Sequence, residues 1–199
     1  MRRRQCEITD PQEISRILSA ATIGRMATSG ADGYPYITPV NFVYFNGNIY
    51  FHCARKGEKL DNIVRDDRVC FQVDIPLAYL DLDATPNGGS CNLHQLYHCV
   101  IIRGRARVVP DGDLKTDALN ALVAAHEPGR TPPPVPADTP AYQACAVVEI
   151  RPENLSAKSD LAQKKSPAER EALARYLAQR NRPGDSETVK AMGLRAGAK

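Results

Sequence analysis

The chain has 199 residues, of which 43% are hydrophobic and 25% are charged. This balance is typical of one soluble globular domain with an appendage, and it excludes a chain that is disordered throughout. The sequence has no apolar run near the roughly 20 residues that a membrane-spanning helix needs, and its N-terminus has no signal-peptide core. We therefore expect a cytoplasmic protein with no membrane partner.

Lysine and arginine together number 26 and aspartate and glutamate 23, so the net charge is only +3. A charge this weak and dispersed does not indicate a nucleic-acid-binding protein. The basic C-terminal helix also carries Glu169 and Glu171, which argues against nucleic acid as a partner there too. The six cysteines are expected to be reduced, because no export signal directs the chain to an oxidising compartment.

Between residues 10 and 74 the apolar pattern changes from helical spacing to alternation and back. Asp10 can cap a helix that has Pro11 at its first position. Asn46-Gly47 predicts a type I′ turn between antiparallel strands, because both central residues of that turn need positive φ. The predicted elements are a helix over 10–21, strands over 23–27, 34–45 and 48–54, a short helix over 56–66 and a strand over 68–74.

The second half of the chain predicts fewer and longer elements. These are a long connection over 76–93 that contains Pro86-Asn87-Gly88-Gly89-Ser90, strands over 97–109 and 144–150, a helix over 111–126, a proline-rich loop over 131–140 and a helix after Ser166-Pro167. Six or seven strands without room for parallel crossovers indicate a mainly β fold with α, a small antiparallel barrel with flanking helices. The composition changes after Pro152, which predicts a domain of residues 1–151 and a C-terminal helical extension of residues 152–199.

The segment after the predicted hairpin carries the strongest sign of a binding site. Arg55, Lys56 and Lys59 bracket Gly57 at the predicted start of a helix. Cationic side chains beside free backbone N–H groups suit a phosphate. An ordinary solvated turn fits the same spacing, because short basic clusters are common on surfaces.

A second constellation offers nitrogen and sulfur ligands for zinc: Cys91, His94, His98 and Cys99. The last two are adjacent and would point to opposite faces of a strand, so we expect no metal site. A third group, Arg103, Arg105 and Arg107, shares one face of a predicted strand. We expect that face to be exposed to solvent and paired with acidic residues.

Five blocks occur in order along the chain: Arg2-Arg3-Arg4 with Ile8-Thr9-Asp10, Gly33 to Phe42, Ile49 to His52 with Gly57 to Asp61, Arg68 to Asp74, and Tyr97 to Ile101 with Gly104 to Ala106. In these blocks the sequence resembles the FMN-binding split-barrel proteins of the pyridoxamine 5'-phosphate oxidase-like superfamily. The resemblance is closest to the nitroimidazole-resistance (Nim-type) flavoproteins. It implies a split β-barrel that forms a homodimer, with FMN in a groove between the two copies.

The resemblance also assigns site residues by position. Those implied to bind the cofactor are Pro39, Val40 and Asn41 along the isoalloxazine ring, Phe51 and His52 flanking it, and Arg55, Lys56 and Lys59 at the phosphate. His52 is implied as the catalytic residue, a proton donor or a group that orients the substrate. Three features depart from the family pattern, namely Cys53 where relatives carry Ser, the long segment 77–93 and the C-terminal extension.

The implied activity is that of an FMN-dependent oxidoreductase. Its electrons would come from a reduced nicotinamide, and its substrate would be a small molecule such as a nitroaromatic. No Gly-x-Gly-x-x-Gly fingerprint follows a strand, so a nicotinamide would visit the flavin groove. The alternative is a non-catalytic flavin- or haem-binding module in which His52, His94 or His98 ligates haem iron.

Overall fold

The computed structural model describes residues 3–84 and 89–194. Its contacts divide the chain into two compact units. The barrel unit consists of residues 11–73 and 100–156, and the terminal unit consists of residues 1–10, 74–99 and 157–199. Residues 85–88 of the predicted long connection and the first arginine of the opening block, Arg2, lie outside the described residues.

Within the described residues, eight strands form one sheet. They are β1 (Glu7–Ile8), β2 (Ile23–Ser29), β3 (Pro35–Asn41), β4 (Val43–Phe45), β5 (Asn48–Ala54), β6 (Arg68–Leu80), β7 (His94–Val109) and β8 (Cys145–Asp160). Their order is β3-β2-β6-β7-β8-β5-β4, with β1 paired to β8. The predicted fold class, a mainly β split barrel with flanking helices, is confirmed. The strand number is eight rather than six or seven, because β1 is an additional strand and the run 34–45 is divided in two.

The predicted strand over 34–45 is two strands, β3 and β4, and the break between them explains how the sheet curls into a barrel. Strands β3 and β4 lie at opposite ends of the sheet order, yet only Phe42 separates them in the chain. The sheet must therefore curl until its two ends meet. Phe42 is 2% exposed, and its ring meets that of Phe71 edge to face at 5.1 Å between centroids. This aromatic pair fills the barrel where the chain passes from one end of the sheet to the other.

The helices are α1 (Pro11–Ala20), α2 (Glu58–Arg65), α3 (Asp113–His126), α4 (Pro140–Ala144), α5 (Pro167–Arg180) and α6 (Asp185–Ala191), with 3-10 turns η1 (Arg4–Cys6) and η2 (Ser90–Asn92). The predictions of α1, α2, α3 and α5 are confirmed. The short helices α4 and α6 were not predicted. No helix among the described residues combines the length and apolar character that crossing a bilayer requires.

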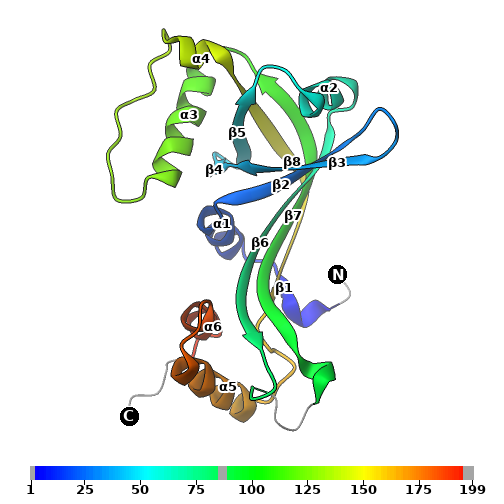
Figure 1. The fold of residues 1–199 in the computed structure, drawn as a ribbon, viewed down its shortest axis with the longest axis vertical. Helices are drawn as coiled ribbons and strands as arrows, with labels where there is room; N and C mark the ends of the chain where they lie inside the picture. Colours follow the sequence, from blue (N-terminus) through cyan, green and yellow to red (C-terminus); the bar gives the residue numbers. More distant parts are fainter. Residues whose placement is uncertain (1–2, 85–88, 195–199) are drawn as a thin grey trace. The chain divides into compact units, whose positions relative to one another are not determined.

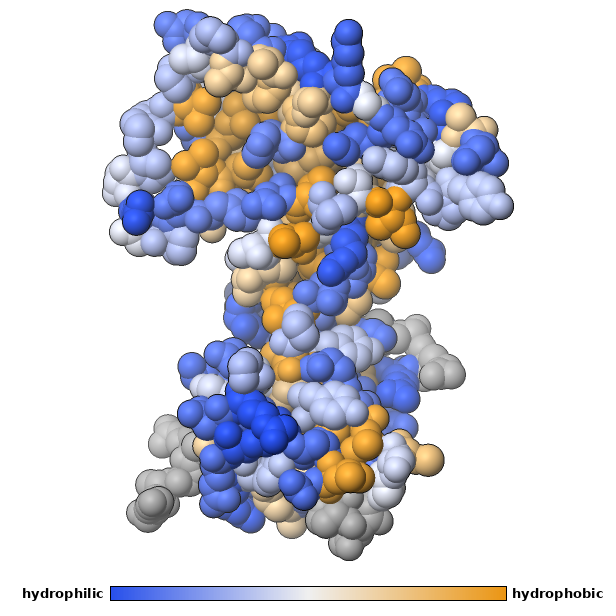
Figure 2. All heavy atoms as spheres, viewed as in Figure 1, coloured by the Kyte–Doolittle hydropathy of each residue, from blue (hydrophilic) through white to orange (hydrophobic). Residues whose placement is uncertain are grey.

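In the barrel unit, α3 packs against β4 and β5 (Figure 1). The buried core at this contact includes Tyr50, Leu119 and Val147, with Phe45 and Leu114 partly buried around it. On the face drawn in Figure 2, apolar side chains gather over α3 and its neighbouring strands. The strands thus bury apolar side chains on the barrel's inside and also under this helix.

In the terminal unit, α5 and α6 pack on the extended ends of the long strands. Ser166 caps α5, and Ser166 and Glu169 form a capping box, as the Ser166-Pro167 signal predicts. Leu173 and Leu177 of α5 are buried together with Leu80 and seven other side chains of this unit. The C-terminal segment therefore packs against residues 74–99 of its own chain.

Substituting Gly24 with Ala is expected to lower the free energy of unfolding by about 1 to 3 kcal/mol. Gly24 lies in β2, and a Cβ atom there would fall 2.0 Å from Cζ of the Phe71 ring. Because Phe71 is completely buried, the ring has no free space to move into. Urea denaturation followed by circular dichroism measures the change. Ser29→Ala, at an exposed position of the same strand, is the control and should change the value by less than about 0.5 kcal/mol.

Candidate functional site

One face of the β2–β3 pair presents apolar side chains to solvent. Among the described residues, β3 pairs with β2 alone, so it is an edge strand. Proline has no N–H to donate to a neighbouring strand, and an edge strand tolerates Pro39 because it has a neighbour on one side only. We define the edge surface as the exposed or half-buried side chains on this face: Ile23, Arg25 and Ala27 of β2 with Pro35, Ile37, Pro39 and Asn41 of β3. Ile37 is 62% exposed and Ile23 is 48% exposed. An apolar group of this kind on an edge strand marks an interaction site.

The edge surface contains two of the three residues predicted to follow the flavin ring. Pro39 and Asn41 are both exposed on this face. Val40 lies between them, is half-buried and points to the other side of the strand, because side chains alternate. A ring lying on the edge surface would therefore touch the side chains of Pro39 and Asn41 and only the backbone of Val40.

The two residues predicted to flank the ring, Phe51 and His52, are adjacent on β5 and point to opposite sides of the sheet. Phe51 is 1% exposed, whereas its neighbour His52 is exposed. Consecutive strand residues face opposite sides of the sheet, so the two side chains cannot lie on one ligand face. Phe51 is part of the buried core, and its role beside a cofactor stays a prediction. His52 is the side chain of this pair that solvent and ligands can reach.

The start of α2 is open to an anion. Gly57 caps the helix with φ 135° and without a side-chain hydrogen bond. Its carbonyl oxygen accepts the N–H groups of Leu60 and Asp61. The first N–H groups of the helix carry partial positive charge, and the described residues place no capping side chain on them. Asn62 of the same helix donates to Thr28 Oγ1 at 3.0 Å, which holds α2 against β2.

Lys56 and Lys59 add cationic charge to this helix start. Lys56 is exposed and Lys59 is half-buried. Burial raises the pKa of the Cys53 thiol above its ordinary value, and Lys59 is close enough to oppose that change. Cys53 therefore stays a neutral thiol at physiological pH and can offer only a weak S–H donor.

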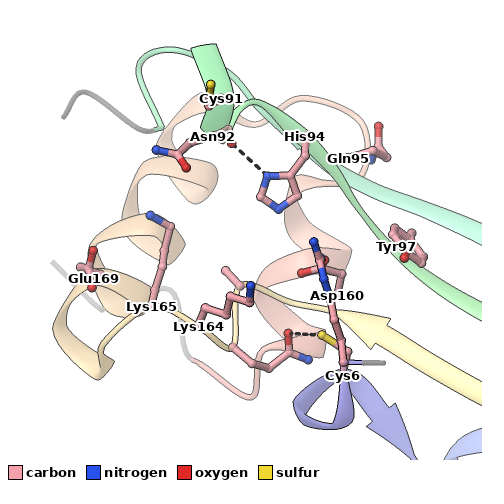
Figure 3. A pocket seen from close by; sticks show the side chains of 13 residues that line it. Cys6, Cys91, Asn92, His94, Gln95, Tyr97, Asp160, Lys164, Lys165 and Glu169 are labelled. Atoms are coloured by element: carbon pink, nitrogen blue, oxygen red, sulfur yellow. Dashed lines mark hydrogen bonds and ion pairs between the residues drawn. The ribbon is translucent and has the colours of Figure 1, made fainter. Parts of the chain in front are cut away.

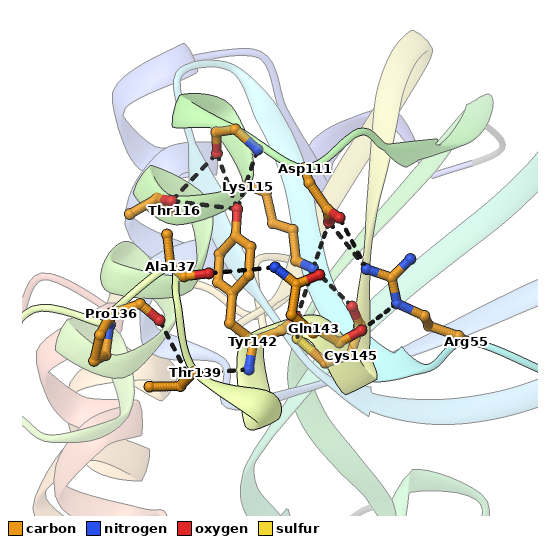
Figure 4. Close-up of polar contacts among 11 residues, drawn as sticks. Arg55, Asp111, Lys115, Thr116, Pro136, Ala137, Thr139, Tyr142, Gln143 and Cys145 are labelled. Carbon is orange, nitrogen blue, oxygen red and sulfur yellow. Dashed lines mark hydrogen bonds and ion pairs between the residues drawn. The ribbon is translucent and has the colours of Figure 1, made fainter.

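Arg55, the third predicted phosphate ligand, is already paired. Its Nη2 donates to both carboxylate oxygens of Asp111 at 3.0 and 3.2 Å, and its Nε donates to the carbonyl oxygen of Gln143 (Figure 4). Hydrogen bonds from Lys115 and then from Arg55 hold the pKa of Asp111 below its ordinary value, although burial opposes them. The structure therefore places Lys56 and Lys59 at the helix start and Arg55 in an ion pair with Asp111.

The other predicted constellations have different outcomes. In the part of the chain that the structure describes, no group of three or more His, Cys, Asp or Glu side chains could hold a metal ion. His98 is buried and hydrogen-bonded to Ser159. Arg105 is paired with Asp67 at 2.7 Å and with Glu153 at 2.8 Å, which confirms that this face carries acidic partners. All six cysteines are free thiols.

One buried carboxylate in the barrel unit was not predicted. Glu149 of β8 is 2% exposed and accepts hydrogen bonds from Tyr50 Oη at 2.8 Å, Asn48 Nδ2 at 3.2 Å and the guanidinium groups of Arg107 and Arg151. Burial raises its pKa, but the donors outweigh burial and leave the pKa below its ordinary value. Glu149 therefore stays ionised and ties β5 and β8 together.

Comparison with protein families gives one match, to a family described as pyridoxamine 5'-phosphate oxidase, over residues 10–159. No curated protein matches the sequence.

Among solved structures, a flavocytochrome from Azotobacter vinelandii is 21% identical, with a TM-score of 0.66 over 80% of this chain and 72% of that one. An FAD- and heme-binding protein from Mycobacterium smegmatis is 19% identical, with a TM-score of 0.65 over 83% and 78%. A proposed 5-nitroimidazole antibiotic resistance protein from Bacteroides thetaiotaomicron is 21% identical, with a TM-score of 0.64 over 77% and 86%. At identities of 19% to 21%, the likeness to these structures shows the fold alone.

Proposed function

This chain belongs to the pyridoxamine 5'-phosphate oxidase family, and from that premise we propose that it is an FMN-dependent oxidoreductase. The observation that carries the proposal is the open start of α2, with Lys56 and Lys59 beside it. The edge surface is the second supporting feature, and it lies on β2 and β3, on the face of β2 opposite to Thr28, through which α2 contacts that strand. A phosphate needs cations and N–H donors, and a flavin ring needs an apolar face with a few polar groups. The barrel unit offers both.

The residues divide between the two ends of the cofactor. The first N–H groups of α2 bind the phosphate, and Lys56 and Lys59 neutralise its charge. Pro39 offers the ring an apolar contact, and the Asn41 amide can both donate to and accept from its polar rim. The description of the Mycobacterium smegmatis structure names FAD. For this chain we propose FMN, because the resemblance to the Nim-type flavoproteins implies it.

We also propose a homodimer, because the edge surface exposes apolar side chains that a second copy of the chain could cover. Ile23 and Ile37 lie on one face of paired strands and are 48% and 62% exposed, so a second copy of the chain packed on this face would bury their apolar area. Covering this face would also keep water from the ring. A bound flavin would supply the redox chemistry, which we propose to be the reduction of a small molecule such as a nitroaromatic with a reduced nicotinamide as the electron donor.

His52 holds or releases a proton at the substrate in this proposal. Its side chain is exposed beside the core residue Phe51, and the two nitrogens of an imidazole can donate and accept hydrogen bonds. His52→Gln should therefore keep the FMN content of the purified protein within twofold while turnover falls about 100-fold, the usual contribution of a general acid. Steady-state kinetics with bound FMN quantified in each sample tests this. Full turnover in the variant would remove His52 from the mechanism.

Lys56→Gln/Lys59→Gln is expected to weaken FMN binding about 10- to 100-fold, as the loss of charge-assisted hydrogen bonds does. Riboflavin, which lacks the phosphate, should bind the variant and the native protein within twofold. Fluorescence titration of both flavins gives the two ratios. Lys190→Gln, on the exposed surface of α6, is the matched control and should change neither. An equal loss of riboflavin and FMN affinity would place the phosphate elsewhere.

A further inference from the structure

The terminal unit contains a polar cavity of about 630 Å³ that the proposed flavin site does not use. Its walls come from three segments of this unit, the N-terminal turn, the start of β7 and the connection from β8 to α5 (Figure 3). None of the residues proposed to hold FMN lines it. Its size is within the range of about 300 to 1,000 Å³ that small-molecule sites occupy.

The charged side chains at this cavity do not all neutralise one another. Arg3 Nη1 pairs with Asp160 Oδ2 at 3.2 Å. Glu169 accepts hydrogen bonds from the backbone N–H and the hydroxyl of Ser166, at 2.8 and 2.7 Å. Hydrogen bonds from Ser166 and, to a smaller extent, the charge of Lys165 hold the pKa of the Glu169 carboxyl below its ordinary value, so Glu169 lies near Lys165 without forming an ion pair with it.

Lys164 and Lys165 are the cations that remain. Among the residues that the structure describes, no carboxylate lies within 4.0 Å of either ammonium group, so neither makes an ion pair. Lys164 is exposed and Lys165 is half-buried, and both line the cavity. Because both lysines line the cavity, an anion bound there is attracted by two positive charges.

His94 faces this pair from the opposite wall of the cavity. Its Nδ1 lies 2.9 Å from the carbonyl oxygen of Asn92. A carbonyl oxygen only accepts, so Nδ1 carries the hydrogen and the ring is fixed by this bond. The second ring nitrogen, Nε2, points away from Asn92, toward the side of the cavity where Lys164 and Asp160 lie (Figure 3). It donates to an anion when the ring is protonated and accepts from a phosphate hydroxyl when the ring is neutral.

We propose that this cavity binds the phosphate group of a small phosphorylated molecule, with Lys164, Lys165 and His94 as its ligands. A phosphate offers oxygens in several directions, which suits donors that approach from two separate segments of the chain. A carboxylate is planar and carries one charge, so it would satisfy fewer of the three groups. The rest of the cavity has room for the organic part of the molecule.

Calorimetric titration of the full-length protein with ribose 5-phosphate tests the proposal. Binding of one molecule per chain is expected, and Lys164→Met/Lys165→Met should weaken it at least tenfold. His94→Gln should weaken it less, because one neutral hydrogen bond remains possible. Lys190→Met, which removes an exposed lysine of α6 outside the cavity, should leave the affinity within twofold.

A second readout distinguishes this cavity from the flavin site. Cys91 is exposed and lines the cavity, so the bound sugar phosphate should slow its alkylation by iodoacetamide at least threefold, measured by peptide mass spectrometry. Cys70, in the barrel unit, should react at an unchanged rate. The proposal is overturned if ribose 5-phosphate does not bind, or if Lys56→Gln/Lys59→Gln abolishes binding while Lys164→Met/Lys165→Met leaves it intact. FMN binding is measured separately, so either site can fail alone.

Discussion

Replacing Arg180 with Met is expected to lower the free energy of unfolding by about 3 to 5 kcal/mol, the usual cost of removing one partner of a buried ion pair. The guanidinium of Arg180 has a side-chain exposure of 7%, and Asp185 has 0%. Its Nε donates to Asp185 Oδ2 at 2.9 Å, and its Nη1 donates to Asp81 Oδ2 at 2.8 Å and to the Tyr79 carbonyl oxygen at 3.0 Å. Without Arg180, Asp185 becomes a buried carboxylate that lacks its main counter-charge.

The measurement is urea denaturation, with hydrogen exchange to locate the change in α5 and α6. Arg180→Met/Asp185→Leu is the informative control, because removing both charges should recover part of the loss. Equal stability of the native protein and the single variant would show that Arg180 is not bound as described.

The same ion pair gives the unfolding free energy a pH dependence. Burial raises the pKa of Asp185, but hydrogen bonds from Arg180 and the Arg182 backbone outweigh it and hold the pKa below the ordinary value of 3.8. A carboxyl with a lowered folded-state pKa adds stability above its unfolded value, and that contribution disappears as the pH falls through the folded value. The contribution of Asp185 to the unfolding free energy of the native protein should therefore decrease as the pH falls below about 3.8.

Replacing Lys115 with Met is expected to cost about 2 to 4 kcal/mol of unfolding free energy, because it leaves two buried carbonyl oxygens without a donor. Lys115 is 1% exposed. Its Nζ donates to the carbonyl oxygens of Tyr142 and Cys145, both at 2.8 Å, and to Asp111 Oδ1 at 2.9 Å. It also lies 4.0 Å from the centroid of the Tyr142 ring. These contacts join α3 to the segment that leads into β8 (Figure 4).

Methionine keeps the length of the lysine stem, so the variant removes the ammonium group with little change in packing. Lys190→Met is the control and should change the unfolding free energy by less than about 0.5 kcal/mol. A loss of similar size in both variants would contradict the role assigned to Lys115. Arg55 should retain its pairing with Asp111 in Lys115→Met, since its hydrogen bonds do not pass through the lysine.

Local signals predicted those parts of the fold that depend on few residues. Asn46 and Gly47 adopt φ of 49° and 80°, as a type I′ turn requires, and they join β4 to β5. The Ser166 cap likewise starts α5 where the sequence indicates. In both cases the preference comes from the residues themselves and needs no distant partner.

Features that depend on distant partners could not be predicted. Alternation continues from Tyr34 to Phe45 and does not reveal that the chain changes its neighbouring strand at Phe42. Residues 76–93 lack a clear period and were predicted to form a connection after the strand over 68–74, yet β6 continues to Leu80. Strand β8 also continues from the predicted end at Ile150 to Asp160.

The candidate site shows the same limit. The cluster at Lys56 and Lys59 is local and was predicted, whereas Asp111, the partner of Arg55, lies 56 positions away. Lysine is rarely buried, so nothing local indicated that Lys115 enters the core. The burial of Phe51 could have been anticipated, because His52 follows it directly on a strand and the two must face opposite sides.

Native mass spectrometry of the freshly purified protein, together with its visible absorption spectrum, tests the central claim most directly. We expect a yellow dimer that holds one FMN per chain and releases it on denaturation. A colourless monomer that also fails to bind added FMN in calorimetry would contradict the proposed function. A red protein with a Soret band would favour the haem-binding alternative instead.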